Sequence, residues 1–186
     1  MIKQKITISS NLFPSPVVLI GVKSETKPNF FLVADIMLSQ YKPLLVLFSC
    51  YKKHYSTPIL IENKCFSLNI PSEDMVAKAD YCGIGSGKNT DKSNVFSVFY
   101  GENIKAPLIE EAPINAVCEL RKTVDMNGTH YIFIAEITEM YAEDEILTKG
   151  RPDYQKVKPY IYTKDNTYRQ MGSIIGKAYK EGKVYK

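Results

Sequence analysis

The sequence has no tryptophan, only two histidines, and only three arginines among its 24 basic residues. His54 and His130 lie far apart in the chain, and no serine or cysteine stands in a motif typical of a nucleophile, so a catalytic triad is not indicated. Two histidines and four dispersed cysteines also make a zinc site a poor interpretation. We therefore assign no catalytic side chain and no metal ligand from the sequence.

Cysteine pairs and long apolar segments are absent too. Cys50, Cys65, Cys82 and Cys118 form no CxxC motif, which favours reduced, mostly buried thiols. The first six residues lack the apolar core of a signal peptide, and the apolar run at residues 17–22 is too short to span a bilayer. We therefore expect a cytoplasmic protein without a membrane partner.

No long basic block is present either. The 24 basic and 20 acidic residues give a net charge of +4 that is spread along 186 residues, of which 45% are hydrophobic. This balance permits an anionic ligand without demanding nucleic acid. There is no internal repeat and no convincing linker, so we expect one domain over residues 1–186.

The residues that are present favour β-structure. Strands are predicted at residues 16–22, 29–37, 44–50, 65–70, 115–125 and 129–140, with a hairpin turn at Asn127-Gly128. A short helix is predicted at residues 56–62, with Ser56 or Thr57 as its N-cap, and a second helix is predicted to begin at Ser72. Apolar residues recur at helical spacing at residues 171–180. The expected class is mainly β, a β-barrel with peripheral helices.

Residues 83–88 (GIGSGK) resemble two nucleotide-binding motifs and match neither. A P-loop needs four residues between its glycines and Ser or Thr after its Lys, but three residues separate Gly83 from Gly87, and Asn89 follows Lys88. The dinucleotide fingerprint needs a preceding strand, whereas a predicted helix precedes this segment. A flexible loop with backbone amides free to hold an anion is the better interpretation.

Five stretches, in order, resemble the flavoredoxin and flavin-reductase-like family. They are residues 14–22 (PSPVVLIGV), 29–35 (NFFLVAD), 54–60 (HYSTPIL), 65–71 (CFSLNIP), and a loop with residues 79–83 (ADYCG), Ser86-Gly87 and Asp91-Lys92. Each stretch alone is a weak signal, but their order is specific, and the resemblance covers residues 12–182. It implies a split β-barrel that dimerises and binds FMN near the subunit interface.

The resemblance also implies site residues. Asn29, Ala34 and Asp35 fall in the segment whose backbone lines the flavin in this family, and Ser56 and Lys92 fall where the family contacts the FMN phosphate.

The resemblance also singles out two histidines as candidate flavin contacts. His54 occupies a position where arginine is commoner, and His130 follows a hairpin turn near a position that approaches the flavin. Leu32 replaces a usual Thr and Asp35 a frequent Trp, so contacts to the flavin ring are expected to differ from the family pattern.

The chemistry of FMN agrees with this assignment. Its phosphate needs hydroxyl or cationic donors and free amides, and its ring needs an apolar wall. Ser56 at a helix start, Lys92 after a glycine loop and the strand at residues 29–37 supply these parts.

The leading hypothesis is therefore an FMN-dependent oxidoreductase that takes electrons from NAD(P)H or a protein donor and passes them to a small-molecule or protein acceptor. A non-enzymatic FMN-binding electron-transfer module is the alternative. A β-barrel that binds single-stranded nucleic acid is a third, but it would need a clustered basic groove.

Overall fold

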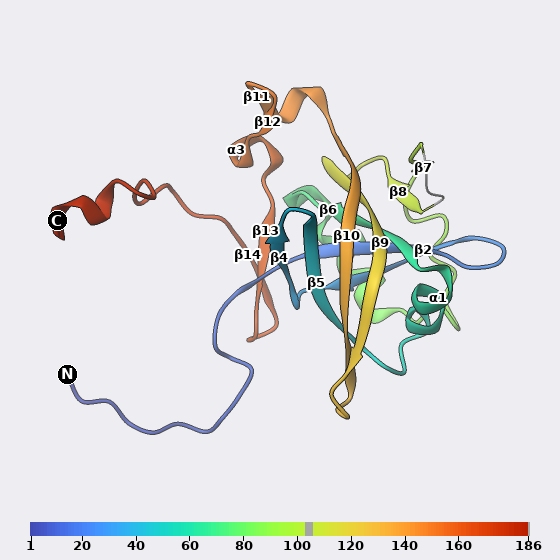
Figure 1. The fold of residues 1–186 in the computed structure, drawn as a ribbon, viewed down its shortest axis with the longest axis horizontal. Helices are drawn as coiled ribbons and strands as arrows, with labels where there is room; N and C mark the ends of the chain where they lie inside the picture. The colour runs from blue at the N-terminus through green and yellow to red at the C-terminus, as the bar shows by residue number, and fades with distance from the viewer. Residues whose placement is uncertain (103–105, 186) are drawn as a thin grey trace.

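A seven-stranded antiparallel sheet forms the centre of the computed structural model, which describes residues 1–102 and 106–185 (Figure 1). Its strands, in spatial order, are β3 (Pro28–Val33), β2 (Val18–Lys23), β6 (Cys65–Ile70), β9 (Ile114–Asp125), β10 (His130–Ala142), β5 (Leu44–Tyr51) and β4 (Ile36–Tyr41). The two edge strands, β3 and β4, are consecutive in the chain, so the short link at residues 34–35 joins the two edges. The sheet thus curls into a split β-barrel, and the predicted fold class is confirmed.

Shorter elements surround the barrel. A three-stranded sheet contains β1 (Ser15–Pro16), β13 (Tyr160–Thr163) and β14 (Thr167–Gln170). Two further sheets have two strands each. One pairs β7 (Val98–Tyr100) with β8 (Pro107–Ile109), and the other pairs β11 (Leu147–Thr148) with β12 (Arg151–Pro152). The helices are α1 (Ser56–Asn63), α2 (Val76–Ile84) and α3 (Tyr154–Val157), with short 3-10 helices at Glu73–Met75, Asp144–Ile146 and Glu181–Tyr185. Within the described part of the chain, no helix combines the length and apolar character needed to cross a membrane.

Three phenylalanines pack inside the barrel. Phe48 of β5 lies 5.1 Å from Phe133 and 5.3 Å from Phe66 between ring centroids, and all three are completely buried. Strand β5 alternates, with Val46, Phe48 and Cys50 pointing inward. Because rings of this size exclude water over a large area, they contribute strongly to the stability of the barrel.

A second apolar cluster lies outside the barrel, where α2 packs against β3. The Phe30 ring meets Phe96 edge to face at 5.7 Å, and Ala79 and Cys82 of α2 complete the contact. Strand β2 is buried on both faces because it contributes side chains to both clusters, as its continuous apolar run predicts.

Several sequence predictions about local structure are confirmed. Cys50, Cys65 and Cys118 lie in strands, and none of the four cysteines is disulfide-bonded. Asn127 takes the left-handed conformation in the β9–β10 hairpin, with φ of 59°.

Three local predictions were wrong. Residues 29–37 form two strands, because the chain turns at Ala34 and Asp35. No helix forms at residues 171–180, where Gly172 and Gly176 weaken helix propensity and the side chains are exposed. Neither Ser56 nor Thr57 caps α1: the N-cap is Tyr55, and the Thr57 hydroxyl donates to the Tyr51 carbonyl at 2.8 Å.

Candidate functional site

Helix α2 ends at Ile84, so Gly83 is helical and the glycine-containing loop occupies residues 85–92, with Lys92 at its end. Only 3% of Lys92 is exposed, and its Nζ donates to the carbonyl oxygens of Cys82 (3.1 Å) and Gly85 (2.9 Å). A cation suits this position because the last carbonyls of a helix carry partial negative charge. Burial lowers the pKa of Lys92, since removal from water disfavours the charged form.

Lys92 has no acidic partner in the part of the chain that the structure describes. Among the described residues, no carboxylate lies within ion-pair distance of its Nζ, and the neighbouring Asp91 pairs instead with Lys27 at 2.6 Å. Buried charges in proteins are normally paired. The position therefore suits an anionic ligand.

Asn29 of β3 and Ser56 at the start of α1 form a buried hydrogen-bonded pair. The Asn29 Nδ2 donates to the Ser56 Oγ at 2.7 Å, and both residues are buried. Gly87 closes over this pair: a Cβ there would lie 2.5 Å from Asn29 Oδ1 and 2.6 Å from Tyr55 Cδ1. Only glycine fits at this approach, a role that sequence reasoning assigned to the loop as a whole and not to Gly87.

His54 lies in the turn between β5 and α1. Its Nδ1 is 3.6 Å from Cys50 Sγ, and its ring packs edge to face against Tyr51 at 5.4 Å. The pKa of His54 is lowered, first by burial and then by the positive charges of His130 and Lys92. His54 is therefore mostly neutral at pH 7 when no anion is bound.

A cavity of about 170 Å³ brings these groups together. It is lined by His54, Ser56, Lys92, Leu32 and the glycine loop, including Ser86 and Gly87. Sites for whole drug-sized or cofactor-sized ligands occupy about 300–1,000 Å³. The cavity thus suits one anionic end of such a ligand, with the remainder lying outside it.

Asn29, Ala34, Asp35 and His130 do not line this cavity, although Asn29 adjoins it through its hydrogen bond to Ser56. His130 begins β10, in register with Tyr51 and with its ring 5.5 Å from the Tyr51 ring. Ala34 and Asp35 form the link between β3 and β4, and the Asp35 carbonyl accepts a hydrogen bond from the Ser49 amide at 3.0 Å.

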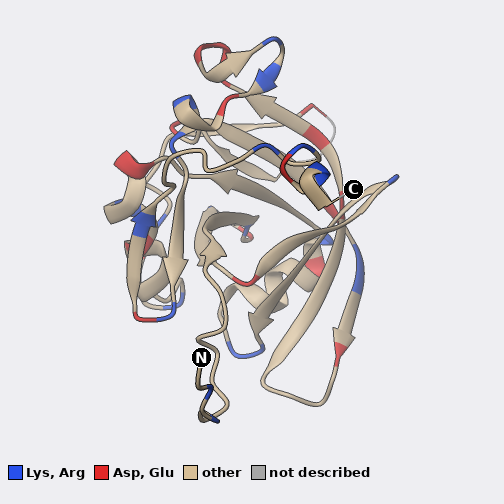
Figure 2. Cartoon of the chain, turned by 90° about the vertical axis from the view of Figure 1, so that its left-hand side faces the viewer, with Lys and Arg blue, Asp and Glu red and all other residues tan. Residues whose placement is uncertain are grey.

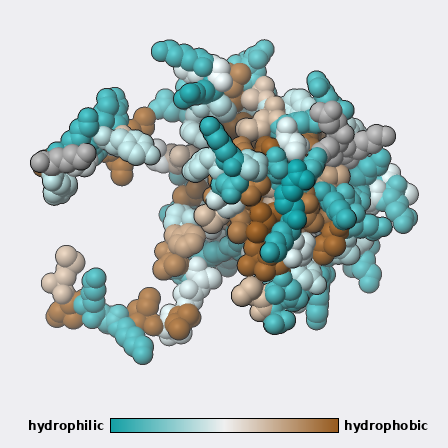
Figure 3. Space-filling model, in the orientation of Figure 1, coloured by the Kyte–Doolittle hydropathy of each residue, from teal (hydrophilic) through white to brown (hydrophobic). Residues whose placement is uncertain are grey.

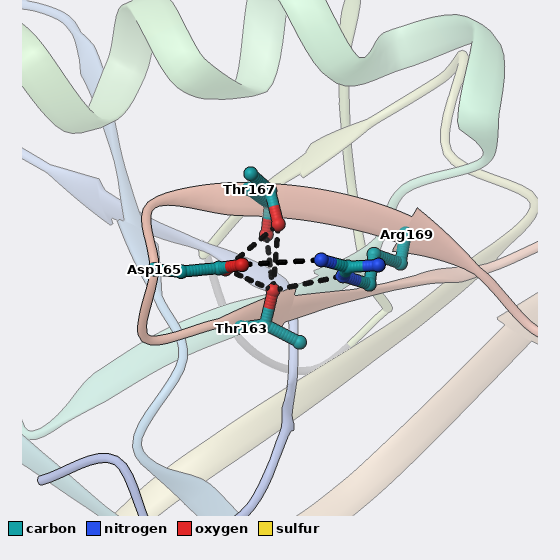
Figure 4. A network of polar contacts seen from close by, with 4 residues as sticks. All are labelled: Thr163, Asp165, Thr167 and Arg169. Atoms are coloured by element: carbon teal, nitrogen blue, oxygen red, sulfur yellow. Dashed lines mark hydrogen bonds and ion pairs between the residues drawn. The ribbon is translucent and has the colours of Figure 1, made fainter.

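The Asp35 side chain pairs with Lys164 of the β13–β14 hairpin, with Nζ and Oδ1 3.0 Å apart. The hairpin is braced by hydrogen bonds and an ion pair among Thr163, Asp165, Thr167 and Arg169 (Figure 4). This network holds the pKa of the Asp165 carboxyl well below its usual range. Lys164 is 129 residues from Asp35, so no local sequence pattern could have revealed it.

Comparisons with known proteins agree with this architecture. Residues 9–171 match the sequence model of the family described as "Flavin reductase like domain". A flavoredoxin from Methanosarcina acetivorans is 37% identical, with 99% of this chain and 100% of that chain covered and a TM-score of 0.93. The flavoredoxin of Desulfovibrio vulgaris (Miyazaki F) is 29% identical, with 98% of this chain and 100% of that chain covered and a TM-score of 0.90. An FMN-binding protein from Thermus thermophilus shares the fold at 22% identity, with 91% of this chain and 94% of that chain covered and a TM-score of 0.78.

Proposed function

Because this chain belongs to the flavin reductase like family and is a flavin-binding redox protein, we propose that its flavin is FMN and that it serves as an FMN-dependent oxidoreductase. NAD(P)H or a protein donor supplies the electrons, and a small molecule or protein accepts them. A bound flavin supplies the redox chemistry, while the protein supplies binding, orientation and electrostatics.

One observation carries the choice of a phosphate-bearing flavin. Lys92 is a buried cation without a carboxylate partner among the described residues, and it lines a cavity bordered by a glycine loop and the Ser56 hydroxyl. A phosphate monoester supplies the missing negative charge together with several hydrogen-bond acceptors. We assign phosphate binding to Lys92, Ser56 and His54, with Asn29 orienting Ser56.

The flavin ring lies outside the 170 Å³ cavity in this proposal. Ala34, Asp35 and His130 are the sequence-predicted residues beyond the cavity, and we assign them to the ring end of the ligand. Where the family often has Trp, this chain offers the Asp35–Lys164 ion pair, so a polar, charged contact replaces aromatic stacking.

Anaerobic mixing with NADH and with NADPH distinguishes the enzyme from a passive electron-transfer module. The proposed reductase bleaches its flavin absorbance directly on addition of one of these nucleotides. A passive module stays oxidised with both and is reduced only by a protein donor.

Nucleic-acid binding has less support. Basic and acidic residues are interspersed along the chain (Figure 2), whereas a single-strand binding groove concentrates positive charge.

Replacing Gly87 with alanine is expected to weaken FMN binding by about tenfold or more. The new methyl group collides with Asn29 and Tyr55, so the Asn29–Ser56 hydrogen bond and the loop cannot both keep their positions. Isothermal titration of the apo-protein with FMN measures the loss. Gly83→Ala is the matched control, because a Cβ there lies 3.4 Å from Leu32 Cβ, an ordinary contact. Equal affinities for the two variants would remove Gly87 from the site.

FMN affinity is expected to rise as the pH falls from about 8 to about 6. The pKa of His54 is lowered in the free protein, and a neighbouring phosphate raises it, so binding takes up a proton. The extra affinity is fully present below the pKa that His54 has in the free protein. It is lost as the pH rises above the pKa that His54 has in the FMN complex. For one proton the slope cannot exceed about tenfold per pH unit.

A comparison with His54→Gln isolates this effect, because titration of the FMN phosphate itself is common to both proteins. The variant should show a flatter pH profile for FMN, and riboflavin should show no difference between the two proteins. Parallel FMN profiles for wild type and His54→Gln would contradict the assignment.

We further propose that the protein is a homodimer, since family resemblance implies one and two-fold dimers are the commonest oligomers. The four free cysteines suit a reducing compartment, and we propose the cytoplasm.

A further inference from the structure

The two ends of the chain extend away from the barrel on the same side of the molecule (Figure 1). We call residues 1–14 the N-terminal arm and residues 171–185 the C-terminal arm; every residue in both is exposed. Among the described residues, the hydrogen bonds of the arms run within each arm, such as that from the Lys177 amide to Glu181 Oε1 at 3.0 Å. In the described part of the chain, no hydrogen bond therefore holds either arm to the body of its own chain, and only the base of each arm lies beside that body.

Apolar side chains are frequent on these arms. Ile6 is 74% exposed and Ile8 99% on one arm, while Ile174 is 75% and Ile175 101% exposed on the other. The space-filling view shows hydrophobic atoms standing out on both arms (Figure 3). Exposed apolar surface on this scale marks an interaction site, because it loses the hydrophobic stabilisation that a partner would restore.

A matching apolar surface lies on the body. A cavity of about 430 Å³ opens beside β4 and β13 and is lined almost entirely by apolar side chains. At its rim Met37 is 60% exposed, Leu38 49% and Met140 58%, and Met171 at the base of the C-terminal arm also lines it. We call this surface the apolar groove. Strand β4 and the β13–β14 sheet lie on the side from which the arms leave (Figure 1).

The distribution of charge is also compatible with binding of the arms to the body of a second copy. The arms, with residue 186 included, carry six lysines and one glutamate, which leaves 18 basic and 19 acidic residues on the rest of the chain. Two basic arms repel each other, whereas a body that is nearly neutral does not repel them. A second copy of this chain offers both the apolar groove and that body.

We infer that two copies exchange arms, each laying its terminal arms over the apolar groove of the other. This inference deepens the proposed homodimer and rests on that part of the proposed function. A two-fold axis makes every such contact twice, so each arm residue contributes two copies of its buried area.

Paired substitutions on the arms test the exchange in the full chain. Ile6→Glu with Ile8→Glu should weaken dimerisation by at least about tenfold, measured by light scattering over a dilution series. Thr7→Glu with Ser9→Glu adds the same charge to the same arm at polar positions and should change the dimer much less. On the other arm, Ile174→Glu is compared with Ser173→Glu in the same way.

A photo-crosslinker placed at residue 8 gives direct evidence of the contact. In an equal mixture of isotope-labelled and unlabelled protein, the exchange predicts mixed-isotope crosslinks to peptides of β4 or β10. Crosslinks within one copy, or a dimer equally stable in the isoleucine and control variants, would overturn the arm exchange. Far-ultraviolet circular dichroism of each variant shows whether the body is folded. FMN titration of the unmodified protein tests flavin binding separately, so failure of the exchange is distinct from failure of the proposed function.

Discussion

Replacing Lys92 with methionine is expected to weaken FMN binding by about a hundredfold. Hydrogen bonds to charged groups contribute about 1.5–3 kcal/mol, and every 1.4 kcal/mol changes an affinity about tenfold. Methionine retains most of the buried apolar stem but supplies no charge for a phosphate. Parallel titrations of the apo-protein with FMN and with riboflavin measure the effect, because riboflavin lacks the phosphate.

Lys92 also binds the carbonyls of Cys82 and Gly85, so its loss loosens the glycine loop to some extent. We therefore expect riboflavin affinity to fall by less than about tenfold, well below the loss for FMN. Lys88→Met is the matched control, since Lys88 lies on the same loop but is exposed. Equal losses for the two ligands would show that Lys92 only orders the loop, and an unchanged FMN affinity would remove it from the site.

Replacing Gly21 with alanine is expected to lower the free energy of unfolding by about 3 kcal/mol, near the upper end of typical overpacking costs. Gly21 lies in the middle of β2, and a Cβ there would collide with the Pro107 carbonyl, the Ser67 hydroxyl and the Phe30 ring. The carbonyl is backbone and accepts a hydrogen bond from Ser67, so it cannot move without breaking a buried contact. Urea denaturation followed by circular dichroism gives the change.

The control for this prediction is Gly128→Ala in the β9–β10 hairpin. No atom lies within 4 Å of a Cβ at that position. Its unfolding free energy should stay within about 1 kcal/mol of wild type. If Gly21→Ala were as stable as Gly128→Ala, the close packing of β2 against the β8 segment would be wrong.

Features that depend on local chemistry could be predicted from the sequence. The apolar run at β2, the alternation of β9 and β10 and the Asn127-Gly128 turn each fix a strand or a hairpin through side-chain period and backbone conformation. These signals identify a β-barrel, and the ordered resemblance then indicates the split-barrel family. Asn29, His54, Ser56 and Lys92, predicted from that resemblance, do line or adjoin one cavity.

Features that depend on distant contacts could not be predicted. The break between β3 and β4 follows from closing the barrel, which the apolar run at residues 29–37 does not reveal. The Asp35–Lys164 pair joins segments 129 residues apart, and the burial of Lys92 arises only when α2 and its loop fold over it. At residues 171–180 the helical spacing was misleading, because an amphipathic pattern forms a helix only where a surface receives its apolar face.

The absorbance spectrum of the purified protein, followed by denaturation and chromatographic identification of any released ligand, tests the central claim most directly. The assignment predicts the visible bands of an oxidised flavin, or their appearance after incubation with FMN and gel filtration, and it predicts FMN as the released compound. A colourless protein that takes up no FMN, or one that retains riboflavin as tightly as FMN, would contradict a phosphate site built around Lys92.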